Sequence, residues 1–364
     1  MVEMKVAVCS PSVEPGDAVS NDILGELRCL SAMGIETRLF AHESMVPGLR
    51  VEPLSRVEAF VTGADDVFLY HYATGWEEAL TTARHVNCRI ALKYHNVTPP
   101  SFFRGVSSEY EQVCTSGLRQ LRYWAALHPW RCIGDSQFNI EGLLAAGADS
   151  ASCRVCPPYS PVEEVERADA DIEFFDSVDD GSVNVLSVGR LAPNKNHAAA
   201  IRAFAEYNAT YRPDSRLIVV GAEDARLRSY TSMLRRLCGS LGVDRKVLFT
   251  GKVSESRLKA AYMAARVFVS TSLHEGFCVP AVEAMAMSIP VVALAAGAVS
   301  ETVGEAGLVW AADAPDIMAV SIDRVVRDAS LAMELGRRGR QRYAASFSTA
   351  AVDKAFSGIM KEAP

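Results

Sequence analysis

The sequence of 364 residues predicts an α/β protein with two Rossmann-like domains. Short apolar stretches alternate with amphipathic ones along the chain, which is typical of parallel sheets covered by helices on both faces. These stretches fall into two sets of six, one before residue 160 and one after residue 182. The length also exceeds what one ordinary core needs and suits two domains of about 150–200 residues.

The first set of apolar stretches predicts the strands of an N-terminal domain, residues 1–160. They cover Lys5–Cys9, Thr37–Phe40, Asp66–Tyr70, Arg89–Tyr94, Arg131–Ile133 and Cys153–Cys156. Helices are expected from Ser20, as N-cap, to Met33, over Ser107–Trp130, and after Ser136 as another N-cap. Because ligands of such folds bind beyond the carboxyl ends of the strands, the residues that follow each strand are the candidates for a site.

Residues 161–182 carry the signals of an interdomain linker. Prolines precede the segment, and residues 161–180 hold nine acidic side chains against Arg167 alone. The second domain, residues 183–346, then has its own strands. They cover Val183–Val188, Arg216–Val220, Lys246–Phe249, Arg266–Val269, Val291–Ala293 and Leu308–Trp310. A last helix is expected over Phe347–Met360.

Composition excludes several classes of protein. The net charge of −7 gives no basic excess, so nucleic acid is not expected as a partner. Nine scattered cysteines, an odd number, suit reduced thiols in the cytoplasm. The chain begins directly with a strand rather than a signal peptide, and no run approaches the ~20 apolar residues of a spanning helix. No G-x-G-x-x-G follows the first strand, which argues against an NAD oxidoreductase. Asp169-Ala-Asp171 lies in the linker, so no metal site is predicted.

The stretch from Ser270 to Met285 predicts an anion site. A strand ends, a short loop follows, and a helix begins at Pro280, a favourable first helical residue. The backbone N–H groups of Phe277, Cys278 and Val279 should then be free to bind phosphate. Glu275 and Glu283 flank this point, and carboxylates accept strongly from hydroxyl groups. A phosphate flanked by hydroxyl-rich rings describes a nucleotide sugar.

Two cations follow the expected strand Val183–Val188. Arg190 offers a bidentate fork to phosphate and Lys195 a point charge, five residues apart at a helix start. The segment is not a Walker loop, which requires Gly-Lys-Ser or Gly-Lys-Thr.

Glu275 and Glu283, with Gly276, Phe277 and Pro280 between them, resemble the E-x7-E motif of retaining glycosyltransferases of family 4. That family has the GT-B fold: two Rossmann-like domains that face each other across a cleft, with a C-terminal helix, here within 347–364, that crosses back to the first domain. The resemblance implies that Glu283 holds the ribose hydroxyls and Glu275 those of the donor sugar. Many members have glycine where this chain has Cys278, so the sugar pocket is expected to differ in shape.

Other segments extend the resemblance. Gly189-Arg190-Leu191 with Lys195 resembles the G-R-L-x-x-x-K segment, whose cations grip the donor diphosphate and stabilise the leaving nucleotide without a metal. Gly276, Phe277, Cys278 and Val279 are expected to contact the donor as well. Lys252 and Val253 are expected to meet the base through backbone groups.

The first domain carries a looser resemblance. Tyr94-His95-Asn96-Val97-Thr98-Pro99-Pro100 is similar to a run in bacterial family 4 enzymes of surface-polysaccharide assembly. By this resemblance His95 contacts the reacting sugar in the transition state, and His71 contacts the acceptor. Gly16 and Asp17 stand where the family has a glycine-containing loop that faces the diphosphate or the acceptor. An ordinary surface loop is an equal interpretation of those two residues.

The resemblance implies a retaining, metal-independent hexosyltransferase without a cofactor other than its nucleotide-sugar co-substrate. The donor would be GDP-mannose or a UDP-sugar, and the acceptor a glycan, lipid-linked in surface-polysaccharide synthesis. The family often docks at the membrane periphery, although an ordinary amphipathic helix is the favoured interpretation of Ser107–Trp130. The competing hypotheses are an epimerase-like enzyme and a non-catalytic binder of nucleotide sugars. The donor base, the sugar, the acceptor and the oligomeric state stay open.

Overall fold

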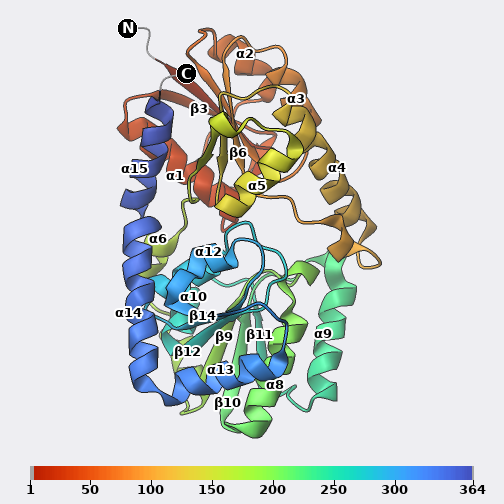
Figure 1. Ribbon diagram of the computed structural model, residues 1–364, viewed down its shortest axis with the longest axis vertical. Coiled ribbons are helices and arrows are strands. Elements are labelled where there is room, and N and C mark those ends of the chain that lie inside the picture. Colours follow the sequence, from red (N-terminus) through yellow and green to blue (C-terminus); the bar gives the residue numbers. More distant parts are fainter. Residues whose placement is uncertain (1–3, 363–364) are drawn as a thin grey trace. The chain divides into compact units, whose positions relative to one another are not determined.

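A computed structural model describes residues 4–362 and divides the chain into two compact units (Figure 1). Unit 1 comprises the described residues up to Pro100, residues Tyr110–Ser160 and those from Ser346 onward. Unit 2 comprises Ser101–Glu109 and Pro161–Ala345. Both are α/β units with a wholly parallel six-stranded sheet, so the predicted fold class is confirmed.

Unit 1 has the strand order β3-β1-β5-β6-β7-β8. The strands are β1 (Lys5–Cys9), β3 (Glu36–Phe40), β5 (Val67–Tyr72), β6 (Arg89–Tyr94), β7 (Arg131–Gly134) and β8 (Cys153–Val155), with a small separate pair of β2 (Ser12–Val13) and β4 (Glu43–Ser44). All six expected strands form within two residues of their predicted bounds. The main difference is that β5 continues through His71 and Tyr72, because these residues pair with Lys93 and Tyr94 of β6.

The two faces of this sheet follow from alternation along each strand. Val67 and Leu69 of β5 belong to a core shared with α1 (Ala18–Ala32) and α15 (Thr349–Lys361). Phe68, Tyr70 and Tyr72 point to the opposite face, against Trp124 of α4 (Ser108–Ala125), with the Tyr70 and Trp124 ring centroids 4.7 Å apart. His71 therefore lies on the face that carries α1.

Helix ends in unit 1 partly follow the predictions. Ser136 caps α5 (Gln137–Ala146) and accepts from the Asn139 N–H, as predicted. The prediction that Ser20 caps α1 is wrong: the Asp17 carboxylate accepts from the Ser20 N–H at 3.0 Å, and the helix begins at Ala18. The remaining helices here are α2 (Val57–Phe60) and α3 (Glu77–Ala83). The helix α4 ends at Ala125, five residues before its predicted end.

The terminal helix α15 belongs to unit 1 and runs beside α1 (Figure 1). Tyr159 fixes this contact, because its hydroxyl donates to Asp353 at 2.7 Å and its ring lies where a Cβ on Gly25 would be 2.1 Å from it. At the end of the helix, Glu362 forms ion pairs with Arg131 and Arg154 at 3.1 and 2.7 Å. The predicted return of the C-terminal helix to the first domain is confirmed.

Unit 2 has the strand order β11-β10-β9-β12-β13-β14. The strands are β9 (Val183–Val188), β10 (Ser215–Val220), β11 (Val247–Gly251), β12 (Ala265–Ser270), β13 (Val291–Leu294) and β14 (Gly307–Trp310). The helices are α8 (His197–Thr210), α9 (Arg228–Ser240), α10 (Glu255–Ala264), α11 (Val279–Ala286), α12 (Val299–Val303), α13 (Pro315–Arg327) and α14 (Ala329–Ser346). The expected strands again form within two residues of their predicted bounds. One apolar core joins this sheet to α8, α9 and α13.

The predicted acidic linker is wrong, because residues 161–182 form α6 (Val162–Arg167) and α7 (Ile172–Val178) within unit 2. Val165 and Phe174 are buried, so these helices are amphipathic and their acids occupy the outer faces. Asp171 caps α7 and pairs with Arg257 of α10 at 2.7 Å. The sequence pattern favours a linker here because like charges outnumber the apolar positions of this segment.

A short segment of the N-terminal half joins unit 2, which the sequence did not indicate. Within Ser101–Glu109, Phe102 lies against the His274 ring, with centroids 6.2 Å apart, and Glu109 pairs with Arg226 at 2.9 Å. None of the helices over residues 4–362 is both long and apolar enough to cross a membrane.

Candidate functional site

The strand order of unit 2 reverses between β9 and β12, from which the sheet grows in opposite directions. Ligands of open parallel sheets bind at such a switch point, beyond the carboxyl ends of the strands. The loop after β9 carries Arg190 and Lys195, and the loop after β12 carries Glu275. Three predicted site residues therefore lie at the position that the topology favours.

The loop after β9 is held tightly against the end of β10. The Gly189 N–H donates to the Val220 carbonyl at 2.8 Å, and the Leu191 N–H donates to Ala222 at 3.0 Å. A Cβ on Gly221 would lie 1.9 Å from the Gly189 carbonyl oxygen, so only glycine permits this approach. Arg190 is exposed between these anchored residues.

Lys195 and Glu275 form an ion pair of 2.6 Å between the two loops. Their side chains are 24% and 9% exposed. The loops are also joined by backbone contacts, because the Leu273 N–H donates to the Asn194 carbonyl at 2.8 Å and the Thr271 hydroxyl to that of Asn196 at 2.8 Å. An ammonium group has three donors, so the Lys195 charge is fixed by Glu275 while it retains capacity for an anion.

The start of α11 follows this ion pair. The helix begins at Val279, one residue before the predicted start, with Pro280 in its first turn. Cys278 caps it with φ 81° and ψ 62°, a left-handed conformation that glycine adopts without strain. A glycine at this position would therefore suit the backbone. A neighbouring loop also contacts this segment, since the Ala298 N–H donates to the Glu275 carbonyl at 2.9 Å.

Glu283 lies on α11, buried behind the loops, and accepts a 2.6 Å hydrogen bond from the Tyr262 hydroxyl. Burial raises the pKa of the Glu283 carboxyl, and the bond from Tyr262 opposes part of that rise. Tyr262 belongs to α10 and was not predicted. No sequence pattern links it to Glu283, because the two meet only in the tertiary structure, where the Tyr262 hydroxyl also lies 3.2 Å from the Pro280 carbonyl.

The other residues predicted on unit 2 are less closely joined to this group. Lys252 is exposed and Val253 half-buried, and both follow β11, two strands away from β9. Gly276 and Phe277 continue the loop between Glu275 and Cys278, and Thr302 donates to the Phe277 carbonyl at 2.6 Å. His274, next to Glu275 and beside Phe102, was not predicted as a site residue, and burial lowers its pKa.

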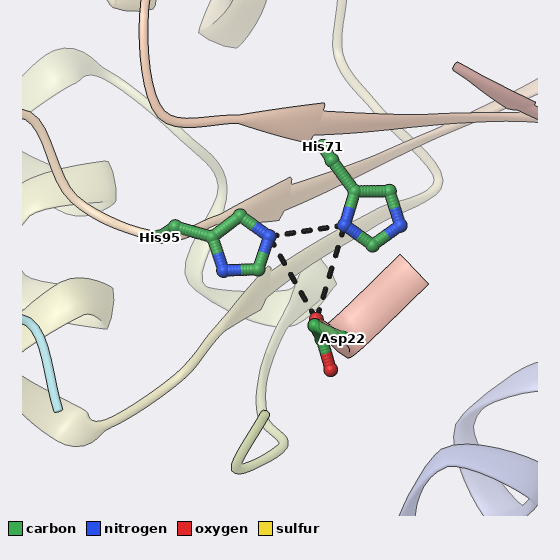
Figure 2. A group of neighbouring side chains, drawn as sticks. All are labelled: Asp22, His71 and His95. Atoms are coloured by element: carbon green, nitrogen blue, oxygen red, sulfur yellow. Dashed lines mark hydrogen bonds and ion pairs between the residues drawn. The ribbon is translucent and has the colours of Figure 1, made fainter. Parts of the chain in front are cut away.

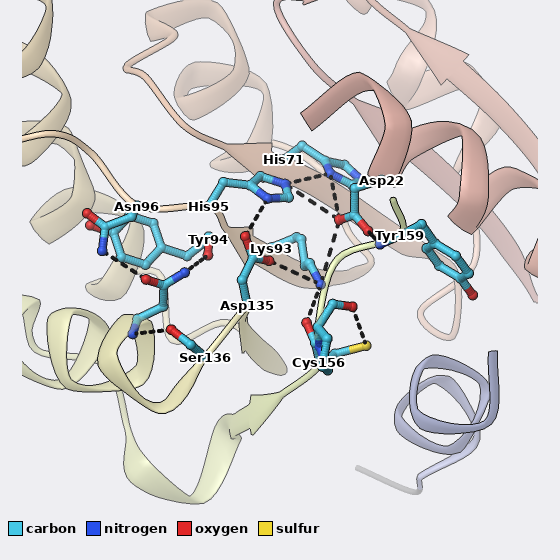
Figure 3. Close-up of polar contacts among 12 residues, drawn as sticks. Asp22, His71, Lys93, Tyr94, His95, Asn96, Asp135, Ser136, Cys156 and Tyr159 are labelled. Carbon is cyan, nitrogen blue, oxygen red and sulfur yellow. Dashed lines mark hydrogen bonds and ion pairs between the residues drawn. The ribbon is translucent and has the colours of Figure 1, made fainter. Parts of the chain in front are cut away.

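Unit 1 has a second group of polar residues, which is buried (Figure 3). The sheet face toward α1 is apolar along Leu69, Ala91 and Ile133. Two residues further along each strand or the loop that follows it, the same face ends in polar side chains. These are His71, Lys93 and Asp135, and α1 sets Asp22 and Glu26, one turn apart, close to them.

Hydrogen bonds connect these groups in a chain. The ring nitrogens of His71 lie 3.0 Å from Glu26 Oε2 and 3.0 Å from His95 Nε2. His95 Nδ1 lies 2.9 Å from Asp135 Oδ2. The Lys93 ammonium donates to the Cys156 carbonyl at 2.7 Å and lies 3.4 Å from Asp135 Oδ1 and 3.6 Å from Asp22 Oδ2.

Burial and neighbouring charges shift the pKa values of this group in different directions. Burial raises the pKa of Asp22 to about 6 and that of Glu26 to about 7, and it lowers that of His71 to about 3. For His95, burial acts to lower the pKa, but the Asp135 carboxylate and its hydrogen bond raise it above the ordinary value. The pKa of Asp135 is correspondingly lowered: His95 and Lys93 outweigh its burial.

This geometry bears on four sequence-based predictions. The His71 side chain is fully buried with both ring nitrogens bonded to protein, which does not support direct contact with an acceptor. His95 is 5% exposed and both its ring nitrogens also have protein partners, so its contact with the reacting sugar stays a prediction. Gly16 and Asp17 lie in an exposed loop, with Asp17 as the α1 cap.

Four charged residues of this group were missed. Lys93 stands inside an apolar strand, and Asp22 and Glu26 lie one turn apart on the buried face of α1, which are signals that a search for buried charges could use. Asp135 follows a strand and gave no signal beyond its position.

Comparisons with known proteins address the family. Residues 169–342 match the family model described as "Glycosyl transferases group 1". An uncharacterized glycosyltransferase of Methanocaldococcus jannaschii, MJ1607, is 37% identical over 153 residues, which cover 42% of this chain and 37% of that protein. D-inositol 3-phosphate glycosyltransferase of Acidothermus cellulolyticus is 37% identical over 163 residues, 43% and 36% of the two chains. The chain thus spans little more than a third of the length of either relative.

Among solved structures, Anabaena Alr3699/HepE in complex with UDP and glucose matches with a TM-score of 0.75 at 17% identity, covering 99% of this chain and 100% of that one. This likeness shows the GT-B fold, and residues 169–342 of the chain are similar to the group 1 glycosyltransferases.

Proposed function

We propose that this protein is a retaining, metal-independent hexosyltransferase that takes its sugar from a nucleotide-diphosphate sugar bound to unit 2. The observation that carries the proposal is the Lys195–Glu275 ion pair of 2.6 Å at the switch point, with the exposed Arg190 in the same loop as Lys195. It joins a phosphate-binding cation to a hydroxyl-binding carboxylate, and a nucleotide sugar presents phosphates and hydroxyls side by side.

The proposed roles follow from charge. Arg190 and Lys195 hold the diphosphate and stabilise the negative charge that grows on it as the sugar leaves. Glu275 orients Lys195 and accepts from a sugar hydroxyl, while Glu283, fixed by Tyr262, accepts from the ribose. The backbone at Gly276, Phe277, Cys278 and Val279 contacts the phosphates and sugar, and that at Lys252 and Val253 contacts the base.

The donor and acceptor are proposed with different support. The UDP and glucose in the HepE structure support a UDP-sugar, with GDP-mannose as the alternative. A lipid-linked glycan of a bacterial surface polysaccharide, met at the cytoplasmic face of the membrane, is the proposed acceptor. Only the similarity of the Tyr94–Pro100 run supports it. His95 is proposed to lie beside the reacting sugar.

A thermal-shift experiment tests donor binding. UDP, GDP, ADP, TDP and NAD are each added with and without EDTA, and each shift is measured against protein in the same buffer. A ligand at a hundred times its Kd adds roughly 2.7 kcal/mol to the native state, which raises the melting temperature of a domain this size by several degrees. One nucleoside diphosphate should give this shift, and EDTA should not remove it.

Two variants make the test specific. Glu283→Ala should lose most of the shift, whereas Glu305→Ala, at an exposed glutamate of the same unit, should keep it. A shift with NAD alone, or with no nucleotide, would contradict the proposal. A shift without sugar transfer to any acceptor, including water, would instead favour the non-catalytic binder.

A further inference from the structure

Asp22, His71 and His95 bring one carboxylate oxygen and two ring nitrogens to a common point in unit 1 (Figure 2). Asp22 Oδ2 lies 3.8 Å from His71 Nδ1 and 3.7 Å from His95 Nε2, and the two nitrogens are 3.0 Å apart. The point equidistant from these three atoms is about 2 Å from each, the length of zinc–nitrogen and zinc–oxygen bonds. We propose that these residues form a binding site for a divalent first-row metal ion, zinc in the first place.

The outer partners of both histidines fit a metal site. Histidine ligands usually donate their second ring nitrogen to a carboxylate or carbonyl, which fixes the tautomer. Here Glu26 lies 3.0 Å from His71 Nε2, and Asp135 lies 2.9 Å from His95 Nδ1. Both remaining nitrogens, His71 Nδ1 and His95 Nε2, are thereby directed with their lone pairs at the same point.

Asp22 supplies an independent observation. Its Oδ1 accepts from the Tyr159 N–H at 2.7 Å, which fixes the carboxylate. Its Oδ2 is fully buried, and among the described residues no hydrogen bond reaches it. A buried oxygen without a hydrogen bond is costly, even with the Lys93 ammonium 3.6 Å away, and this one is aimed at the two histidine nitrogens.

The net negative charge of the cluster also favours the binding of a cation. With neutral imidazoles and ionised carboxyl groups, Asp22, Glu26 and Asp135 carry three negative charges, and Lys93 supplies one positive charge. The surplus of two is buried, which is expensive unless it is neutralised. The positive charge of Lys93 repels a second cation. Its ammonium group is, however, shared between the Cys156 carbonyl and Asp135, and a divalent ion brings the net charge of the cluster to zero.

Two protons would neutralise the cluster equally well, with one of them held between the two ring nitrogens. This is the alternative that an experiment has to separate. The ligand set of two imidazoles and one carboxylate suits zinc, cobalt and ferrous iron. Such an ion would tie α1 to the ends of β5 and β6, and its three ligands all belong to unit 1.

Metal analysis of the full chain tests the site. The protein is prepared with its affinity tag removed, stripped with a chelator, incubated with Zn²⁺ or Co²⁺ and desalted. We expect about one equivalent per chain by elemental analysis, and intense visible absorption of the Co²⁺ form, as tetrahedral coordination produces. Asp22→Asn and His71→Gln should each lower the bound metal to less than about one tenth of an equivalent. His42→Gln should keep it, since His42 is an exposed histidine beside Glu78 in the same unit.

The wild-type measurements keep the test decisive if the variants misfold. Wild-type protein that binds neither Zn²⁺ nor Co²⁺ above about one tenth of an equivalent would overturn the proposal and assign the two charges to protons. Co²⁺ that binds with the weak absorption of six-coordinate sites, or that the His71→Gln variant retains, would place the metal elsewhere and overturn it as well. Neither outcome affects the nucleotide-induced shift that tests the donor site.

Discussion

The two units place charged residues at the same edge of two similar sheets, but these residues are exposed to water in unit 2 and buried in unit 1. In unit 2, Arg190 is exposed and Lys195 is 24% exposed. In unit 1, His71, Lys93 and Asp22 have no exposed side-chain surface. The open group, in unit 2, is in contact with water, whereas the charges of the closed group, in unit 1, must find their partners inside the unit, in other side chains or in a bound ion. The same topology therefore places an exposed group of charges in one unit and a buried group in the other.

The largest expected effect comes from removing the buried cation of unit 1. Lys93→Met leaves Asp22 and Asp135 without their ammonium partner, and breaking a buried pair in this way costs about 3–5 kcal/mol. Urea unfolding of chelator-treated protein measures the loss. Lys252→Met, at an exposed lysine of unit 2, should change the free energy of unfolding by less than about 0.5 kcal/mol. Equal losses in the two variants would remove the contrast between the closed and open groups.

Arg190 should show the reverse pattern, with a large effect on turnover and a small one on stability. Arg190→Ala loses charge-assisted hydrogen bonds of about 1.5–3 kcal/mol each, which corresponds to a roughly 10- to 150-fold fall in turnover. The free energy of unfolding should change by less than about 0.5 kcal/mol, because the side chain is exposed. Arg236→Ala, at an exposed position of α9, is the control. Unaltered kinetics in Arg190→Ala would exclude it from the diphosphate site.

The buried carboxylate of the open site predicts a pH dependence. Burial raises the pKa of Glu283, so on acidification it takes up a proton before an ordinary glutamate does and then no longer accepts from both ribose hydroxyls. Calorimetry should show nucleotide affinity falling as the pH is lowered, with a midpoint above the usual value of about 4.3. Glu283→Gln should bind weakly at every pH, with that transition absent. If Glu283→Gln and Glu305→Gln gave the same curve as the wild type, another group would be responsible.

The smallest effect concerns backbone strain at the open site. Cys278 holds a left-handed conformation that costs a residue with a side chain about 1–2 kcal/mol, so Cys278→Gly should be more stable than Cys278→Ala by about 1 kcal/mol. The buried Cys238 lies within α9, and in a helix alanine is more stabilising than glycine by about 1 kcal/mol. The order of the two substitutions should therefore invert between these positions in thermal unfolding. The same order at both would mean that Cys278 carries no strain.

Much of the fold followed from sequence because apolar runs and their spacing are local properties. Each of the twelve expected strands forms, and the C-terminal helix joins unit 1. The motif residues of unit 2 were predictable for the same reason, since Arg190, Lys195 and Glu275 lie in the segments that follow two expected strands. The prediction of a linker was wrong because, in the sequence, the acidic residues outweigh the few apolar positions that α6 and α7 bury.

The sequence by itself determined the α/β class, the two sheets and the residues that stand at their carboxyl ends. Only the tertiary structure decided which of those residues are exposed to water and which contact one another. Lys195 reaches Glu275 across 80 positions of sequence, and Asp22, His71, Lys93 and Asp135 converge from a helix, two strands and a loop. The physical reason is that burial and charge pairing depend on how α1 packs on its sheet, which no local spacing encodes.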